Sequence, residues 1–164
     1  MSRWRPPGER TLPYITAAGF CALEQELKEI WVRRRDVVSH LAAAAAEGDR
    51  SENAEYIYRK KELRELDRRI RYLQKRIPDL KVVDEAPADP DKVFFGAVID
   101  LEDESGETSK LRIVGSDEAN AGAGLISVDS PLAKASLGKS IDDEIKVTIG
   151  DSQKSYWVVA VDYP

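Results

Sequence analysis

Two stretches of the chain carry apolar residues at alternating steps of three and four, and this spacing limits the possible folds more than any other feature. The first stretch runs from residue 17 into the alanine run at 42–46, and Arg34 interrupts its apolar positions, which are Phe20, Leu23, Leu27, Ile30, Val37 and Leu41. The apolar positions of the second are Tyr56, Leu63, Leu66, Ile70, Leu73, Ile77 and Leu80. Because this is the heptad spacing, each stretch predicts a long helix that packs against a partner helix.

Residues beside the two stretches predict where the helices begin and end. Thr16 is a suitable N-cap for the first helix. Gly48 comes just after the alanine run, at a position where a glycine often ends a helix. Pro78 predicts the end of the second helix, or a break near it. Because the link between the helices is very short, we predict an antiparallel two-helix coiled coil over residues 14–82, about 45 Å long at 1.5 Å per residue.

After residue 82 the pattern changes from helix to strand. The acidic, proline-rich stretch 83–91 is typical of a linker. The strands that follow are predicted at 93–101, 109–114 and 125–128, with a final hairpin formed by 143–149 and 156–163. Ser130 as N-cap and Pro131 at the first helical position predict a short helix that ends at Gly138. We therefore expect an α+β domain at residues 92–164, and a disordered basic lead-in at residues 1–13.

Composition narrows the classes of function. Cys21 is the only cysteine and His40 the only histidine, so a cysteine-based zinc cluster and most Cys/His nucleophile schemes lack parts. No run of 18 apolar residues occurs and the N-terminus lacks the apolar region of a signal peptide, so we expect no membrane span and a cytoplasmic location. Residues 1–80 hold 17 basic and 13 acidic side chains, whereas residues 81–164 hold 8 and 17. This asymmetry suggests two modules with different partners.

The predicted second helix carries a dense run of positive charge. Residues 59–76 contain nine Lys or Arg side chains and three Asp or Glu. Like charges at this density destabilise a helix, which favours an anionic partner; the alternative is a solvated face with pairs such as Glu65–Arg69. Tyr56 and Tyr58 lie beside the run and could either stack on nucleic-acid bases or pack at the helix seam.

The link between the two predicted helices contains Asp49 and Glu52, two carboxylates three residues apart. One interpretation is a capping box, with Asp49 as N-cap of the second helix and Glu52 at its third position. The other is a metal role, because carboxylates at this spacing, about 5–6 Å apart at Cβ, can face one cation. Mg²⁺ takes about six oxygen ligands, so this pair would hold it only where a partner supplies the rest.

The residues around this link also resemble a known family. The stretch from Gly48 to Tyr56, followed by Lys60 to Leu73, resembles the Gre family of bacterial transcript-cleavage factors, and its GreB branch more than its GreA branch. The stretches 93–97 and 128–135 resemble the family as well, so the match extends over residues 13–163. The resemblance implies an antiparallel coiled coil followed by an FKBP-like α+β domain.

The resemblance also implies an accessory factor that is not itself an enzyme. Its globular domain would dock at the rim of the secondary channel of bacterial RNA polymerase, and its rod would carry the link to the polymerase active centre. There Asp49 and Glu52 would help to hold a Mg²⁺ shared with the polymerase and position a water, so that the polymerase cuts the 3′ end of a backtracked nascent RNA. In the same way, the resemblance assigns RNA contact to Arg59, Lys60, Lys61 and Arg64, and polymerase docking to Ser130, Pro131 and Ala133.

Three other interpretations are also consistent with the sequence. A protein of the same fold could occupy the channel and regulate the polymerase without cleavage. The FKBP-like domain could be a peptidyl-prolyl isomerase, which needs an aromatic-lined pocket; the available side chains are Phe94, Phe95, Tyr156, Trp157 and Tyr163. The coiled coil could instead serve as a dimerisation module, although we expect a monomer when the protein is free.

Overall fold

The computed structural model describes residues 10–48 and 53–164, which divide into two units. One unit is residues 20–80, and the other combines residues 10–19 with residues 81–164. Helix α1 (Ala17–Ala46) begins in the second of these units and continues through the first.

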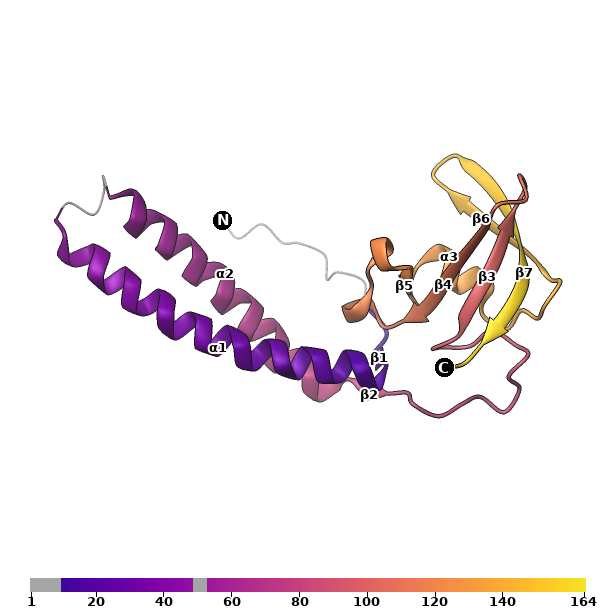
Figure 1. The fold of residues 1–164 in the computed structure, drawn as a ribbon, viewed down its shortest axis with the longest axis horizontal. Helices are drawn as coiled ribbons and strands as arrows, with labels where there is room; N and C mark the ends of the chain where they lie inside the picture. Colours follow the sequence, from indigo (N-terminus) through magenta and orange to yellow (C-terminus); the bar gives the residue numbers. More distant parts are fainter. Residues whose placement is uncertain (1–9, 49–52) are drawn as a thin grey trace, which may run out of the picture. The chain divides into compact units, whose positions relative to one another are not determined.

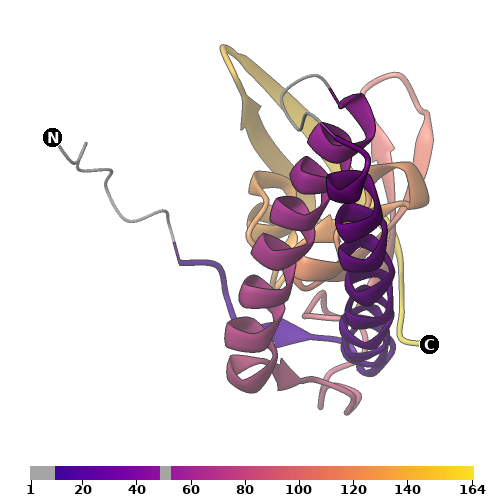
Figure 2. The same cartoon turned by 90° about the vertical axis from the view of Figure 1, so that its left-hand side faces the viewer.

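Two long helices make up the first unit, α1 and α2 (Ala54–Arg76), and they lie side by side in both views (Figure 1, Figure 2). Arg33 of α1 pairs with Glu62 of α2, whereas Glu26, earlier on α1, pairs with Arg69, later on α2. Partners therefore run in opposite directions along the two helices, which confirms the predicted antiparallel coiled coil.

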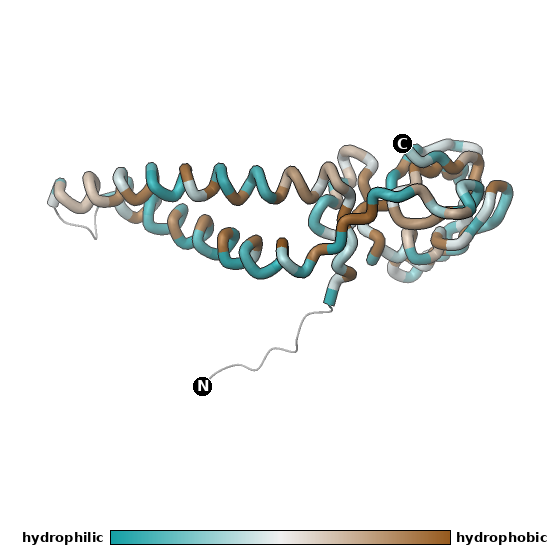
Figure 3. The backbone as a smooth tube through the Cα atoms, turned by 90° about the horizontal axis from the view of Figure 1, so that it is seen from below, coloured by the Kyte–Doolittle hydropathy of each residue, from teal (hydrophilic) through white to brown (hydrophobic). Residues whose placement is uncertain are grey.

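The seam between the helices follows the predicted heptad pattern. Its buried members are Leu23, Val37, Ala44, Ile70 and Leu73. Hydrophobic residues recur between hydrophilic ones along both helices (Figure 3). Burial of this narrow apolar stripe holds the two helices together, since each has polar residues around most of its circumference.

The ends of the helices differ from the sequence-based prediction at one place. The Thr16 hydroxyl accepts the Gly19 N–H at 3.1 Å, as expected of an N-cap, and Gly48 has a φ of +126° after the end of α1. The N-cap of α2, however, is Asn53, whose side-chain oxygen accepts the Tyr56 N–H at 3.1 Å. The prediction that Asp49 caps α2 is therefore wrong, and so is the capping box that it would form with Glu52. An asparagine side chain caps a helix as well as an aspartate does.

The end of α2 agrees with the prediction from Pro78. A 3₁₀ turn, η1 (Ile77–Asp79), continues directly from α2 and has the proline in its first turn. Because proline lacks an N–H and restricts the residue before it, an α-helix rarely continues through it.

The second unit contains a five-stranded sheet with strand order β5-β4-β3-β7-β6. Its strands are β3 (Val98–Asp103), β4 (Thr108–Val114), β5 (Leu125–Ser127), β6 (Glu144–Ile149) and β7 (Ser152–Asp162). Neighbours are antiparallel except β4 and β5, which are parallel and joined through the 3₁₀ turns η2 (Ser116–Glu118) and η3 (Ala121–Ala123). With helix α3 (Pro131–Ser136), this confirms the predicted α+β class.

Two strand boundaries differ from the prediction by four residues or more. Residues 93–97 form a turn instead of the start of a strand, because the Ala97 N–H donates to the Phe94 carbonyl and Gly96 has a φ of +87°. Strand β7 begins four residues earlier than predicted, at Ser152, since its first half pairs with β6. Neither the turn at 93–97 nor the pairing of the first half of β7 with β6 is visible in the local apolar pattern.

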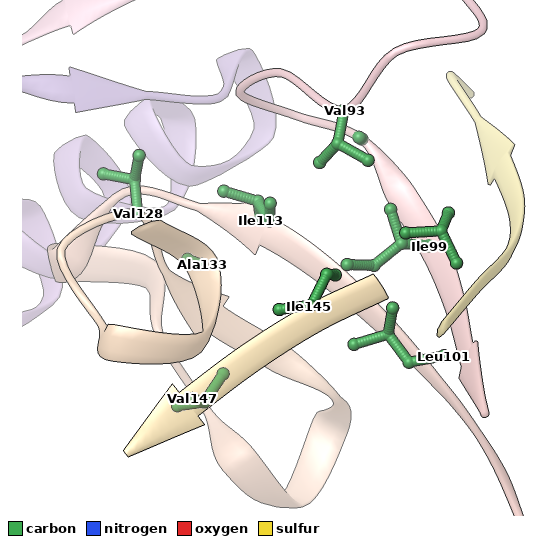
Figure 4. Packing of buried hydrophobic residues seen from close by; sticks show 10 residues of the cluster. Val93, Ile99, Leu101, Ile113, Val128, Ala133, Ile145 and Val147 are labelled. Atoms are coloured by element: carbon green, nitrogen blue, oxygen red, sulfur yellow. The ribbon is translucent and has the colours of Figure 1, made fainter. Parts of the chain in front are cut away.

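The core of the sheet unit lies where α3 packs against the sheet (Figure 4). Ile99 and Leu101 of β3, Ile113 of β4 and Ile145 of β6 are buried in one cluster, and Ala133 of α3 belongs to the same cluster with no exposed surface. Strand alternation supplies the inward residues, and the small side chain of Ala133 lets the helix approach closely.

A short parallel pair completes this unit. Strand β1 (Tyr14–Ile15) pairs with β2 (Lys81–Val82), and Ile15 is fully buried. The predicted coiled-coil segment 14–82 included both strands, whereas their contacts group them with the sheet. Strands of two residues have no periodicity from which to predict them. Among the described residues, no helix is both long and apolar enough to cross a membrane.

Candidate functional site

The link between α1 and α2 is bordered by a hydrogen-bonded pair that joins the two helix ends. The Asn53 side chain donates from Nδ2 to the Ala44 carbonyl of α1 at 2.8 Å while its oxygen caps α2. One side chain thus satisfies a carbonyl in the last turn of one helix and an N–H in the first turn of the next. Asp49 and Glu52, the predicted metal ligands, lie outside the described residues.

The basic run on α2 divides into an inward set and an outward set. Arg59 belongs to the inward set: its Nε donates to Glu55 at 2.8 Å and its Nη1 to Glu62 at 3.2 Å. The hydrogen bond to Glu55, followed by the attraction of both carboxylates, raises the pKa of Arg59 above its ordinary value in spite of partial desolvation. Glu62 also accepts from Arg33 of α1. Arg59 is therefore engaged within the coiled coil, which weakens its predicted role in RNA contact.

Arg69 belongs to the inward set as well. Its Nε and Nη2 donate to the two carboxylate oxygens of Glu26 at 2.7 and 3.0 Å, a bidentate pair across the helices. The nearby Arg34–Asp67 pair, at 2.7 Å, joins the helices in the same way. The predicted Glu65–Arg69 pair is replaced by this contact between helices.

Four cations of α2 form the outward set, which we name the outer stripe: Lys61, Arg64, Arg68 and Lys75. All four are exposed, and none forms an ion pair with another residue in the described ranges. Their spacing of three, four and seven residues puts them on one face, over about 21 Å of helix at 1.5 Å per residue. Arg68 and Lys75 were missing from the predicted RNA-contact residues, although this spacing could have identified them.

The tyrosines near the link differ in exposure. Tyr56 is half-buried and lies 5.8 Å from the Nζ of Lys60, measured to the ring centroid, whereas Tyr58 is 59% exposed. The guanidinium of Arg59 lies 5.5 Å from the centre of the Tyr58 ring. Of the two tyrosines beside the basic run, Tyr58 is thus the more accessible for stacking on a base, whereas Tyr56 is half-buried.

The predicted docking residues on α3 have separate structural roles. The Ser130 hydroxyl caps α3 by accepting the Ala133 N–H at 3.3 Å, and Ala133 has no exposed surface. A direct contact between Ala133 and a partner is therefore incompatible with this fold, because the helix must bury one side to pack on the sheet. Pro131 and Lys134 are exposed on α3.

The described residues do not complete a metal site. No group of three or more His, Cys, Asp or Glu side chains within them could hold a metal ion. Glu55, the described carboxylate at the start of α2, is paired with Arg59. The oxygen donors of Asp49 and Glu52 suit Mg²⁺ chemically, but two carboxylates fall well short of its usual set of about six oxygens.

The aromatic residues considered for an isomerase pocket are dispersed. Trp157 is exposed, while Tyr156 packs against the core. The Tyr163 hydroxyl accepts the Phe94 N–H at 2.9 Å and donates to the Lys92 carbonyl at 2.5 Å. Burial, partly offset by that N–H, raises the pKa of Tyr163, so the hydroxyl stays a neutral donor. Tyr163 therefore holds the turn at 93–97. Phe95 and Tyr163 line one cleft and Tyr156 lines another, so the five aromatic side chains do not all meet in one pocket.

Comparison with known proteins gives matches over most of the chain. The family model described as "Transcription elongation factor, N-terminal" matches residues 13–82, and "Transcription elongation factor, GreA/GreB, C-term" matches residues 87–163. A transcription elongation factor GreB of Xanthomonas axonopodis pv. citri is 58% identical, covering 99% of this chain and 98% of its own length. The GreB of Pseudomonas aeruginosa is 53% identical, covering 100% and 98%. Among solved structures, the Gfh1 protein of Thermus thermophilus is 26% identical, covers 93% of this chain and 99% of its own, and has a TM-score of 0.43.

Proposed function

Because the chain belongs to the GreA/GreB family of transcription elongation factors, we propose that it binds bacterial RNA polymerase and stimulates the polymerase's own cleavage of backtracked RNA. In this proposal the protein is an accessory factor and not an enzyme. The observation that carries the proposal is the antiparallel coiled coil whose helix ends are joined by Asn53, because it confines the link with Asp49 and Glu52 to the end of a rod. A cytoplasmic location goes with this function.

We assign the chemical role to the two carboxylates of the link. Asp49 and Glu52 would contribute oxygen ligands to a Mg²⁺ whose remaining ligands come from the polymerase, and would orient a water near the RNA phosphate. Mg²⁺ bound there would stabilise negative charge on the phosphoryl oxygens and make the water more acidic. Two carboxylates on a rigid support suffice for this role, since the larger protein provides the rest of the site.

RNA contact falls to the outer stripe together with Lys60 and Tyr58. Exposed cations at steps of three and four residues can neutralise successive phosphates of a single strand without reading its sequence. An exposed tyrosine beside them adds a surface for base stacking. The inward pairs of Arg59 and Arg69 hold the rod together instead. This division accounts for seven of the nine basic residues at 59–76.

Regulation of the polymerase without cleavage is the second candidate. The sequence favours cleavage because both carboxylates of the link are present. The deciding experiment adds the protein to a stalled, backtracked elongation complex with Mg²⁺ and measures the length of the RNA over time. Shortening from the 3′ end, faster than by polymerase alone, is the expected result; binding without any shortening would establish the second candidate.

A further inference from the structure

The seam of the coiled coil is packed less tightly near the link than at its other end. The buried seam residues of α2, Ile70 and Leu73, both lie near the C-terminal end of that helix. The last buried residue of α1 before the link is Ala44, whose side chain removes far less apolar surface from water than a leucine does. Apolar packing therefore contributes little to holding the two helices together at the link.

At the link end, hydrogen bonds of the half-buried Asn53 join the helices instead. Its Nδ2 donates to the Ala44 carbonyl at 2.8 Å, and the same carbonyl accepts the Glu47 N–H at 3.2 Å. On the side of α2, Oδ1 of Asn53 accepts the Tyr56 N–H and its backbone carbonyl accepts the Ile57 N–H, each at 3.1 Å. Asn53 is thus fixed to the last turn of one helix and the first turn of the other at once.

We propose that Asn53 is a positioning residue for stimulated RNA cleavage. By holding the first turn of α2 against the last turn of α1, it fixes both ends of the link, and so sets how strongly Asp49 and Glu52 hold the shared Mg²⁺. The inference rests on the proposed function. Glu52 directly precedes Asn53 in the chain, and Asp49 directly follows Gly48. Metal ligands must be held within about 0.5 Å of their productive geometry, so residues that fix the supports of the ligands affect metal affinity.

Capping of α2 alone would be a simpler role for Asn53, and one substitution separates the two roles. Serine is about as good an N-cap as asparagine, so Asn53→Ser keeps the cap. The single polar atom of serine, one bond nearer the backbone, cannot accept the Tyr56 N–H and also reach the Ala44 carbonyl. Asn53→Ser therefore loses only the hydrogen bond between the helices, whereas Asn53→Ala loses the cap as well.

The first test titrates Mg²⁺ in a stalled, backtracked elongation complex with the full chain. Asn53→Ser should raise the Mg²⁺ concentration at half-maximal cleavage about tenfold, the usual effect of losing a contact that supports metal ligands, and leave polymerase affinity nearly unchanged. Asn53→Ala should raise it similarly and also lower the melting temperature, which Asn53→Ser should largely keep. Ser39→Ala removes another small polar group at an exposed position of α1 and is the control, with the Mg²⁺ dependence of the wild type.

The second test needs neither polymerase nor metal. One spin label is attached to Cys21, the exposed native cysteine of α1, and another to Ala54→Cys, at an exposed position in the first turn of α2. We expect a narrow distribution of the distance between the labels with Asn53 present, and a broader or displaced one in Asn53→Ser.

Equal distance distributions would overturn the inference, because any defect in cleavage would then not arise from position. An unchanged Mg²⁺ dependence of Asn53→Ser, in complexes where the wild-type chain stimulates cleavage, would overturn it as well. If the wild-type chain stimulates no cleavage, the proposed function itself fails, and the inference fails with it whatever the spin labels report.

Discussion

The carboxylate of Glu118 accepts hydrogen bonds from both the backbone N–H and the hydroxyl of Thr16, the residue that caps α1. The N–H bond is 2.9 Å long, and the same oxygen accepts the Gly115 N–H at 2.8 Å. Thr16 is 5% exposed, and its hydroxyl in turn accepts the Gly19 N–H. Glu118 of η2 therefore fixes the first turn of α1 within the sheet unit. Its carboxylate lies at the N-terminus of α1, where negative charge is favourable.

Removal of this carboxylate should destabilise the sheet unit. Glu118→Ala leaves the Thr16 and Gly115 N–H groups without their acceptor in a partly buried place, which should lower the free energy of unfolding by about 1–3 kcal/mol. Glu144→Ala, on an exposed position of β6, is the control and should change it by less than about 0.5 kcal/mol. Chemical denaturation followed by circular dichroism measures both; equal stability of the two variants would contradict the role of Glu118.

Gly19→Ala should be destabilising although alanine favours helices. A Cβ on Gly19 would lie 2.1 Å from Oε1 of Glu118 and 2.4 Å from its Cγ, so the Glu118 side chain would have to move and lose its hydrogen bonds. The cost is therefore limited to roughly that of Glu118→Ala. In a Glu118→Ala background, Gly19→Ala should instead stabilise by up to about 1 kcal/mol through helix propensity. A double-mutant cycle with additive effects would refute this coupling.

Asp49→Asn combined with Glu52→Gln should leave polymerase binding nearly unchanged and abolish stimulated RNA cleavage. Neutral amides keep the size of both side chains but lose the charge that a Mg²⁺ ligand needs. Glu47→Gln, an exposed carboxylate two residues before Asp49, is the matched control and should cleave like the wild type. The readout is the rate of RNA shortening in a stalled complex. Undiminished cleavage by the double variant would exclude the proposed role of the carboxylates.

Charge reversal in the outer stripe should weaken action on long backtracked RNA. Lys61→Glu with Arg64→Glu removes two cations that have no ion pair among the described residues. A second double variant, Lys60→Glu with Lys61→Glu, should act in the same direction. Each lost phosphate contact should lower the dependence of log affinity on log salt by about 0.7 for a single strand. Arg69→Ala should instead destabilise the coiled coil, since it breaks the pair with Glu26. Cleavage rates across a salt series separate the two effects.

The turn after β3 should contribute stability that depends on pH. Hydrogen bonds from the Ser105 side chain, followed by the Glu107 and Ser105 N–H groups, lower the pKa of Asp103 below its ordinary value of 3.8. A group whose folded pKa is lowered stabilises the fold above its unfolded pKa, and this contribution is lost as pH falls through the folded pKa. Asp103→Asn should therefore show a smaller loss of melting temperature than the wild type between pH 6 and pH 3. Parallel pH profiles would show that Asp103 contributes nothing in this range.

Local pattern predicted the elements that repeat. The heptad spacing of Leu23, Ile70 and Leu73 predicted the two helices, since a 3.6-residue period marks its buried side without knowledge of the partner. Ser130 and Pro131 predicted α3 because helix caps act over three or four residues. In the candidate site, the sequence identified the basic run on α2 but did not separate its inward and outward members. That separation depends on Glu26 and Glu62, whose positions across the seam are known only once the helices are paired.

The sequence by itself determined the helical rod, the α+β class and the position of the link with Asp49 and Glu52, because each follows from periodicity or from capping within a few residues. Only the tertiary structure decided that Asn53 caps α2, that Glu118 holds Thr16, and that Leu12 lies against Asp129. The last two contacts join residues more than 100 positions apart. Buried polar groups need hydrogen-bond partners, and which groups are buried is decided only when the sheet and its attached segments pack together. These two contacts therefore depend on the tertiary structure.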